Sequence, residues 1–198
     1  MILARSIIIP SIIIYIILIL YGLNKRILKE KLFIGSIIYF IFVFIIMLTI
    51  FPITIDQRVI KSDIELGYET SNNIIPFKII YNEIIDNGYD HIGSTIYQLG
   101  GNFIMLFPIG YLVPIILDKK VDVKLIALII FSTSLFIELT QFFIGRVINY
   151  NYRSFDIDDI ILNTLGGLFG YLILKLTYPI VRNFYKINYF EENKENKD

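Results

Sequence analysis

Polar and charged side chains are concentrated in one stretch of an otherwise apolar sequence, between residues 138 and 171. This stretch runs from the end of one apolar segment, through a short loop, into the start of the next. Charge at the edge of a membrane-sized helix is energetically costly, so such residues are candidates for a functional site. The candidates are Glu138, Gln141, Arg146, Arg153, Asp156, Asp158, Asp159 and Asn163.

Three kinds of chemistry are open to these side chains. Glu138 and Asp159 could act as general acid and base, but two carboxylates on different helices fix neither their separation nor their pKa values. Carboxylate oxygens could also bind a divalent cation, although the loop lacks the spacing of a calcium loop and Arg153 would repel the ion. Asp156 or Asp158 could instead cap the helix that follows. We therefore assign no catalytic residue and no metal site.

The composition excludes several classes of protein. An apolar fraction of 56% and a mean hydropathy of +0.67 are too high for an ordinary soluble domain. The absence of cysteine excludes disulfides, zinc–thiolate sites and a cysteine nucleophile. Acidic and basic residues balance at 18 each, so the charge predicts no nucleic-acid partner. The chain contains no phosphate-binding loop, dinucleotide fingerprint or nucleophile elbow, and we expect no cofactor.

Five apolar runs predict an all-α integral membrane protein with about five transmembrane helices. Each run is long enough to cross a hydrocarbon core about 30 Å thick. Glycine and proline punctuate the third run, which predicts a kinked or broken helix there. The runs cover residues 7–23, 32–55, 95–117, 125–144 and 160–181.

The positions of lysine and arginine predict how the chain crosses the membrane. Most of them lie in the first connection, in the third connection and in the C-terminal tail. Cytoplasmic loops carry an excess of these residues, so the N-terminus is predicted outside and the C-terminus in the cytoplasm. The predicted parts are two N-terminal transmembrane helices (1–55), an extracytoplasmic polar loop (56–94), a three-helix core (95–181) and a cytoplasmic tail (182–198).

Two of the apolar runs carry polar residues along one helical face. In the last run, Asp159 and Asn163 are followed at helical spacing by Gly166, Gly167 and Gly170. Small residues of this kind allow another helix to approach closely. The corresponding face of the preceding run contains Ser134, Glu138, Gln141 and Gly145.

We expect these two faces to meet near the outer leaflet, with Asn102 of the third run beside them. Arg146 or Arg153 would then complete an ion-pair cluster with the carboxylates at the rim. Such contacts would staple three helices together, because charges inside a membrane commonly pair with one another. The same groups could also form a recessed, outward-facing pocket for a polar headgroup, and the two interpretations are compatible.

Three sequence motifs follow one another along the chain, and their order indicates a family resemblance. They are Asn73-Ile74-Ile75-Pro76-Phe77, then the glycine- and proline-rich segment from Gly101 to Pro114, and then the Glu138–Gln141, Arg153–Asp159 and Asn163–Gly167 elements. Together they resemble the VanZ-like family of bacterial membrane proteins, over about residues 70–178. The motif positions that carry the resemblance are Pro76, Asn102, Pro108, Gly110, Glu138, Gln141, Arg153, Asp156, Asp159, Asn163, Gly166 and Gly167.

The resemblance implies a multi-pass protein of the bacterial cell membrane, in a family whose named member is associated with teicoplanin resistance. It supplies no catalytic residue. We expect an outward-facing pocket that binds an amphipathic ligand, such as a lipid-linked cell-wall precursor or a glycopeptide, in a protein surrounded by the lipid bilayer. The predicted polar cluster is Asn102, Glu138, Gln141, Arg153, Asp156, Asp159 and Asn163. The predicted structural positions are Pro76, Pro108, Gly110, Gly166 and Gly167.

Two alternatives of other classes stay open at this point. An intramembrane enzyme acting on a lipid-linked wall precursor would use Glu138 and Asp159, and turnover that depends on both would identify it. An ion-coupled transporter is favoured by the broken third run, but the small number of spans and the lack of an internal repeat count against it.

Overall fold

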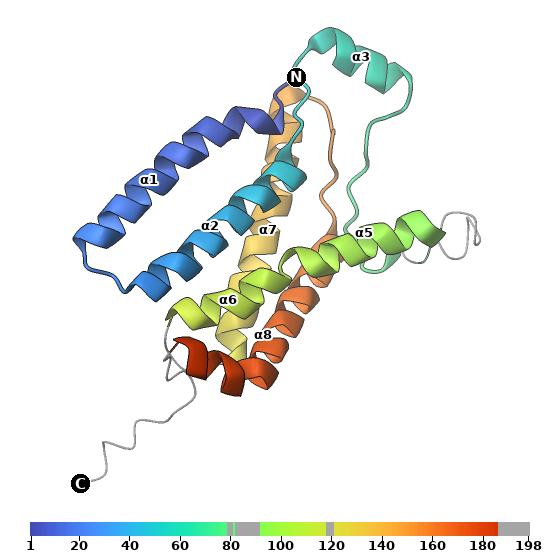
Figure 1. Cartoon of the computed structure of the whole chain (residues 1–198). Helices are drawn as coiled ribbons and strands as arrows, with labels where there is room; N and C mark the ends of the chain where they lie inside the picture. Colours follow the sequence, from blue (N-terminus) through green and yellow to red (C-terminus); the bar gives the residue numbers. More distant parts are fainter. Residues whose placement is uncertain (79–80, 82–91, 118–120, 186–198) are drawn as a thin grey trace.

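The computed structural model describes residues 1–78, 81, 92–117 and 121–185, and these form a bundle of helices (Figure 1). Parts of the predicted polar loop (79–80 and 82–91) and most of the predicted tail lie outside this part of the chain. The described elements are the 3-10 turn η1 (Ala4–Ile7) and the helices α1 (Ile8–Asn24), α2 (Lys29–Ile50), α3 (Gln57–Glu65), α5 (Ile92–Met105), α6 (Phe107–Leu117), α7 (Val123–Ile148) and α8 (Ile157–Tyr185).

Five segments are long and apolar enough to cross a membrane, which confirms the predicted class of multi-pass helical membrane protein. They are Ala4–Asn24, Lys29–Ile50, Ile96–Leu117, Val123–Ile148 and Ile157–Ile180. The N-terminus and α3 lie at the opposite end of the bundle from the last turns of α8 (Figure 1). The predicted orientation, with the N-terminus outside, stays a prediction.

The helix boundaries differ from the apolar runs in physically understandable ways. Helix α2 ends at Ile50 rather than at residue 55, because the ring of Pro52 disfavours helical backbone at the residue before it. Helix α3 lies in the polar loop, where no helix was predicted. Its first turn is capped by Asp56, whose Oδ1 accepts a hydrogen bond of 3.0 Å from the backbone N–H of Arg58.

The third span is broken, as its glycines and prolines predicted. Helix α5 ends at Met105 and α6 begins at Phe107. Leu106, between them, has 0% of its surface exposed and belongs to the apolar core. Pro108 lies in the first turn of α6, where the N–H that proline lacks would have no intrahelical acceptor.

Helix α8 is the centre of the bundle and packs against α5, α6 and α7 (Figure 1). Its glycines lie directly against the backbone of the broken span: a Cβ on Gly166 would collide with the carbonyl of Phe103, and one on Gly170 with the carbonyl of Phe107. Gly110 of α6 likewise faces the carbonyl of Gly167. The small face of α8 therefore allows the close backbone approach predicted from its spacing.

Helix α1 is the most peripheral span. Gly22 is the only buried residue of α1. The helix packs mainly on α2. The Tyr39 hydroxyl of α2 donates a hydrogen bond of 2.6 Å to the carbonyl of Ser11 in α1. The remaining surface of α1 is apolar, as expected for a helix that faces lipid.

We expect Gly166→Ala to lower the Tm of the purified protein in detergent, because the new methyl group would overlap a main-chain oxygen that cannot move without shifting α5. Overpacking of this kind typically costs about 1–3 kcal/mol. Gly100→Ala is the matched control, since a Cβ there would meet no atom within 4 Å and alanine favours helix. Thermal melting followed by circular dichroism would check the order, and equal Tm values for the two variants would contradict it.

Candidate functional site

The carbonyl groups at the end of α2 are bonded by side chains from distant parts of the chain. Arg153, in the α7–α8 loop, donates from Nη2 to the carbonyls of Leu48 (3.0 Å) and Phe51 (3.2 Å). Gln141 of α7 donates from Nε2 to the carbonyl of Thr49 at 2.9 Å. These carbonyls lie at a helix end and lack intrahelical donors, so the two side chains complete the cap of α2.

Tyr152 bonds the remaining carbonyl of this group. Its hydroxyl donates to the carbonyl of Ile50 at 3.0 Å. Burial raises the pKa of the Tyr152 phenol above its ordinary value, with the neighbouring Arg153 acting in the opposite direction. The phenol therefore remains protonated at neutral pH and keeps its role as a donor.

A second group of contacts joins the polar loop to the start of α8. The Nδ2 group of Asn73 donates to Asp156 Oδ1 at 2.9 Å and to Asp158 Oδ2 at 3.2 Å. The backbone N–H of Phe77 donates to the other oxygen of Asp158. The main chains also bond, from the Asn73 N–H to the Phe155 carbonyl at 2.8 Å. Both carboxylates are buried, and both accept hydrogen bonds within this junction.

Glu138 and Asp156 connect this junction to α7. Glu138 has 2% of its surface exposed, and its Oε2 accepts a hydrogen bond of 2.9 Å from the backbone N–H of Asp156. Asp156 Oδ1 in turn accepts from the N–H of Asp158 at 2.8 Å, which is the geometry of a helix N-cap. This cap explains why α8 begins at Ile157, before the predicted residue 160.

Burial raises the pKa of the Asp156 carboxyl above its ordinary value. The bond from Asn73 and the N–H of Asp158 oppose this effect because they favour the charged form.

Helices α7 and α8 meet through the polar faces predicted for them. Asn163 Nδ2 donates to Ser134 Oγ at 2.9 Å, and both residues have 0% of their surface exposed. Asn163 Oδ1 has no hydrogen-bond partner within the described part of the chain. Asp159, one turn earlier on α8, accepts a hydrogen bond from Asn102 Nδ2 of α5. The predicted proximity of these three helices is therefore present.

A pocket of about 510 Å³ lies between α2 and the other helices. Its walls are apolar on the α2 side, where Ile41, Phe44, Ile45 and Leu48 contribute. We call it the carboxylate pocket, after the two acidic side chains among its polar residues. These polar residues are Gln98, Asn102, Glu138, Gln141, Arg153 and Asp159.

The structure separates the predicted cluster into two groups. Asn102, Glu138, Gln141, Arg153 and Asp159 line the carboxylate pocket, together with the motif residue Pro108. By contrast, Asp156 and Asn163 are buried in helix contacts. Pro76 is exposed and precedes Phe77, whose φ is +64°. Gly110, Gly166 and Gly167 lie in the helix packing described above.

The predicted ion pair of Glu138 with an arginine is not formed. Within the described residues, Arg153 bonds the α2 carbonyls instead, and the guanidinium of Arg146 lies 5.1 Å from the centre of the Phe142 ring. An arginine can bond carbonyl oxygens as well as carboxylates, and the sequence did not reveal that a helix end lies within its reach.

Sequence reasoning also missed Asn73 and Tyr152. The Asn-x-x-Pro-Phe element marked Asn73 as part of a motif, but gave no indication of its partners. Among the described residues, no group of three acidic or histidine side chains is arranged to hold a metal ion.

Comparison with known proteins gives one finding. The VanZ/LLP1 family profile matches residues 36–178, which is more than half of the chain. No curated protein and no solved structure matches. The matched region includes most of α2, all of the residues that line the carboxylate pocket, and the Asn73 junction.

We expect Arg153→Gln to destabilise the fold by about 2 kcal/mol, because hydrogen bonds from a charged donor contribute about 1.5–3 kcal/mol. Arg146→Gln is the matched control, since this exposed arginine only stacks on Phe142, a contact of about 0.5 kcal/mol. Circular dichroism melting in detergent would rank the two. Equal losses would show that the bonds to α2 contribute little.

We expect Asp156→Asn to change how stability depends on pH. Asp156 Oδ1 accepts both side-chain and main-chain bonds, and an amide oxygen can keep both. Because the folded pKa is raised, the carboxyl contributes stability that is fully present below about pH 4 and is lost as pH rises through the folded pKa. The wild-type Tm should therefore fall relative to that of Asp156→Asn as the pH rises above about 4. A pH-independent difference would contradict this assignment.

Proposed function

We propose, from the premise that the chain belongs to the VanZ/LLP1 family, that it is a cell-envelope membrane protein whose carboxylate pocket binds an amphipathic ligand. The observation that carries the proposal is the composition of this pocket, in which polar side chains from α5, α7, α8 and the α7–α8 loop face an apolar wall from α2. A polar headgroup fits the first surface and a hydrocarbon chain fits the second. The volume of about 510 Å³ is in the usual range of small-molecule sites.

The apolar wall supports entry of the ligand from the bilayer. Phe44 and Leu48 line the pocket, and 59% and 53% of their surfaces are exposed. In a membrane, these side chains contact acyl chains. A ligand whose tail already lies in the lipid could therefore reach the polar residues without crossing water.

The polar groups indicate the chemistry of the headgroup. Glu138 and Asp159 present carboxylate oxygens, and these accept hydrogen bonds from hydroxyl, amide or ammonium groups. Gln98 adds an amide that can donate or accept. The amide of Gln141 and the guanidinium of Arg153 are held in place by the end of α2. A lipid-linked cell-wall precursor and a glycopeptide such as teicoplanin both carry hydroxyl and amide groups, and we propose a contribution to glycopeptide resistance on this basis.

An intramembrane enzyme is the second candidate, because Glu138 and Asp159 line the same pocket. One carboxyl could donate a proton and the other accept one. Incubation of the purified protein with a lipid-linked wall precursor separates the two functions. Binding without turnover supports a binding protein, whereas turnover that is lost in both Glu138→Gln and Asp159→Asn supports the enzyme.

We expect Glu138→Gln to reduce protection against teicoplanin in a susceptible host that lacks its own copy. The glutamine oxygen can still accept from the Asp156 N–H, so the junction is kept while the carboxyl group in the pocket is lost. The loss of one hydrogen bond to the ligand corresponds to about tenfold weaker binding. The measurement is the inhibitory concentration of teicoplanin, with membrane levels matched by blot.

Glu65→Gln is the control variant, because Glu65 is an exposed glutamate of α3 outside the pocket. Protection by both variants at the wild-type level would remove Glu138 from the proposed site. If the wild-type protein gives no protection, the resistance component fails. The binding component is then tested by titrating the lipid-linked precursor onto the purified protein. Weaker binding to Glu138→Gln than to the wild type supports it, and equal affinity contradicts it.

A further inference from the structure

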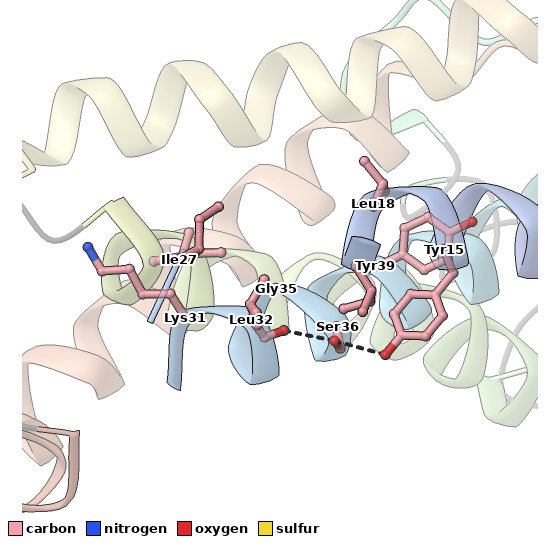
Figure 2. A pocket seen from close by; sticks show the side chains of 10 residues that line it. Tyr15, Leu18, Ile27, Lys31, Leu32, Gly35, Ser36 and Tyr39 are labelled. Atoms are coloured by element: carbon pink, nitrogen blue, oxygen red, sulfur yellow. Dashed lines mark hydrogen bonds between the residues drawn. The ribbon is translucent and has the colours of Figure 1, made fainter. Parts of the chain in front are cut away.

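A second pocket, of about 350 Å³, lies between α1 and α2, with Ile116 of α6 also lining it (Figure 2). It belongs to the opposite part of α2 from the carboxylate pocket. On α2, this pocket is lined by residues from Lys31 to Tyr39, and the carboxylate pocket by residues from Ile41 to Thr49. The two pockets share no lining residue, and the following inference does not rest on the proposed function.

The interior of this pocket is suited to hydrocarbon. Leucine and isoleucine make up half of its lining residues, and the rings of Tyr15 and Tyr39 add further apolar surface. The hydroxyl groups within it already have partners: Tyr15 donates to Ser36 Oγ at 3.0 Å, Ser36 donates to the Leu32 carbonyl at 2.8 Å (Figure 2), and Tyr39 donates to the Ser11 carbonyl. Their hydrogen-bonding needs are met within the helix pair. An acyl chain could thus lie against them without leaving a donor unpaired.

One end of the pocket carries a basic side chain. Figure 2 shows the Lys31 ammonium at one end of the lining residues, with Tyr15 and Tyr39 toward the other. Lys25 and Arg26 lie in the connection between α1 and α2, and Lys29 lies beside Glu30 in the first turn of α2. This connection is predicted to be cytoplasmic, and that leaflet is the one in which anionic lipids attract basic segments beside a membrane helix.

We infer that this pocket is a binding site for an anionic phospholipid, with one acyl chain between α1 and α2 and the phosphate at Lys31. The apolar interior selects the chain, and the basic connection selects the charge of the headgroup. An apolar groove with a cationic mouth is complementary to a lipid in both respects. A second copy of this chain would present to the mouth the same positively charged connection and would be repelled there.

Retention of phosphatidylglycerol against phosphatidylcholine tests the inference. The full-length protein is reconstituted in nanodiscs with equal amounts of both lipids, and the lipids that stay bound are counted by native mass spectrometry. Lys31→Gln should reduce retained phosphatidylglycerol about fivefold, the effect expected for one basic residue near an anionic surface. Lys124→Gln is the matched control, since Lys124 lies at the start of α7 and outside the pocket.

A second pair of variants tests the acyl-chain position. Leu18→Trp would fill the pocket, whereas Leu20→Trp adds the same side chain at an exposed position of α1 that does not line it. Both sites contact lipid, so both variants should fold. Loss of retained lipid in Leu18→Trp alone is the expected result.

Three outcomes would overturn the inference. Equal effects of the two lysine variants would mean that phosphatidylglycerol binds the basic surface generally. Unchanged retention in Leu18→Trp would place the lipid outside the pocket. If Leu18→Trp changes the fraction of dimer seen by native mass spectrometry without changing the amount of retained lipid, the occupant of the pocket is a second copy of the chain.

Discussion

The fold depends on the side chains that hydrogen-bond the last carbonyl groups of α2. A helix leaves its last carbonyl groups without intrahelical donors, and near the hydrocarbon region water cannot be relied on to supply them. In this protein Gln141, Tyr152 and Arg153 provide those donors from α7 and the α7–α8 loop. The N-terminal helix pair is thereby fastened to the rest of the bundle. The carboxylate pocket lies along the inner face of the helix that these bonds hold.

The acidic residues of the same region are also constrained by backbone groups. Asp156 caps α8, and Glu138 accepts a hydrogen bond from the N–H of Asp156. Asp158 accepts a hydrogen bond from the N–H of Phe77, in the turn that follows Asn73. Main-chain N–H groups thus link Glu138 to Asp156 and Asp156 to Asp158. Burial of several acids in one place is tolerable because each has donors assigned to it. The charge cluster that marked this region in the sequence is therefore, in large part, a set of helix and loop contacts around a pocket.

Much of this architecture could be predicted from local patterns. The apolar runs gave the five spans, glycine and proline placed the break in the third, and helical spacing identified the faces of α7 and α8 that meet at Ser134 and Asn163. What could not be predicted depends on distant partners. Arg153 has carboxylates close to it in the sequence, and only the folded position of α2 shows that carbonyl groups are its partners. The role of Asn73 likewise requires the polar loop to return to the start of α8.

The contacts of the broken third span with α8 have a mechanical consequence. Phe103, before the break, lies on Gly166, and Phe107, after it, lies on Gly170. Both halves of the span therefore contact the same helix, at positions one turn apart. The break is for this reason a fixed bend and not a hinge. The other wall of the carboxylate pocket is α2, whose polar fastening lies at its C-terminal end. The pocket therefore has one wall, the third span, fixed along α8, while its other wall is held to the bundle by hydrogen bonds at one end and by the core residues Ile34 and Ile45 along its length.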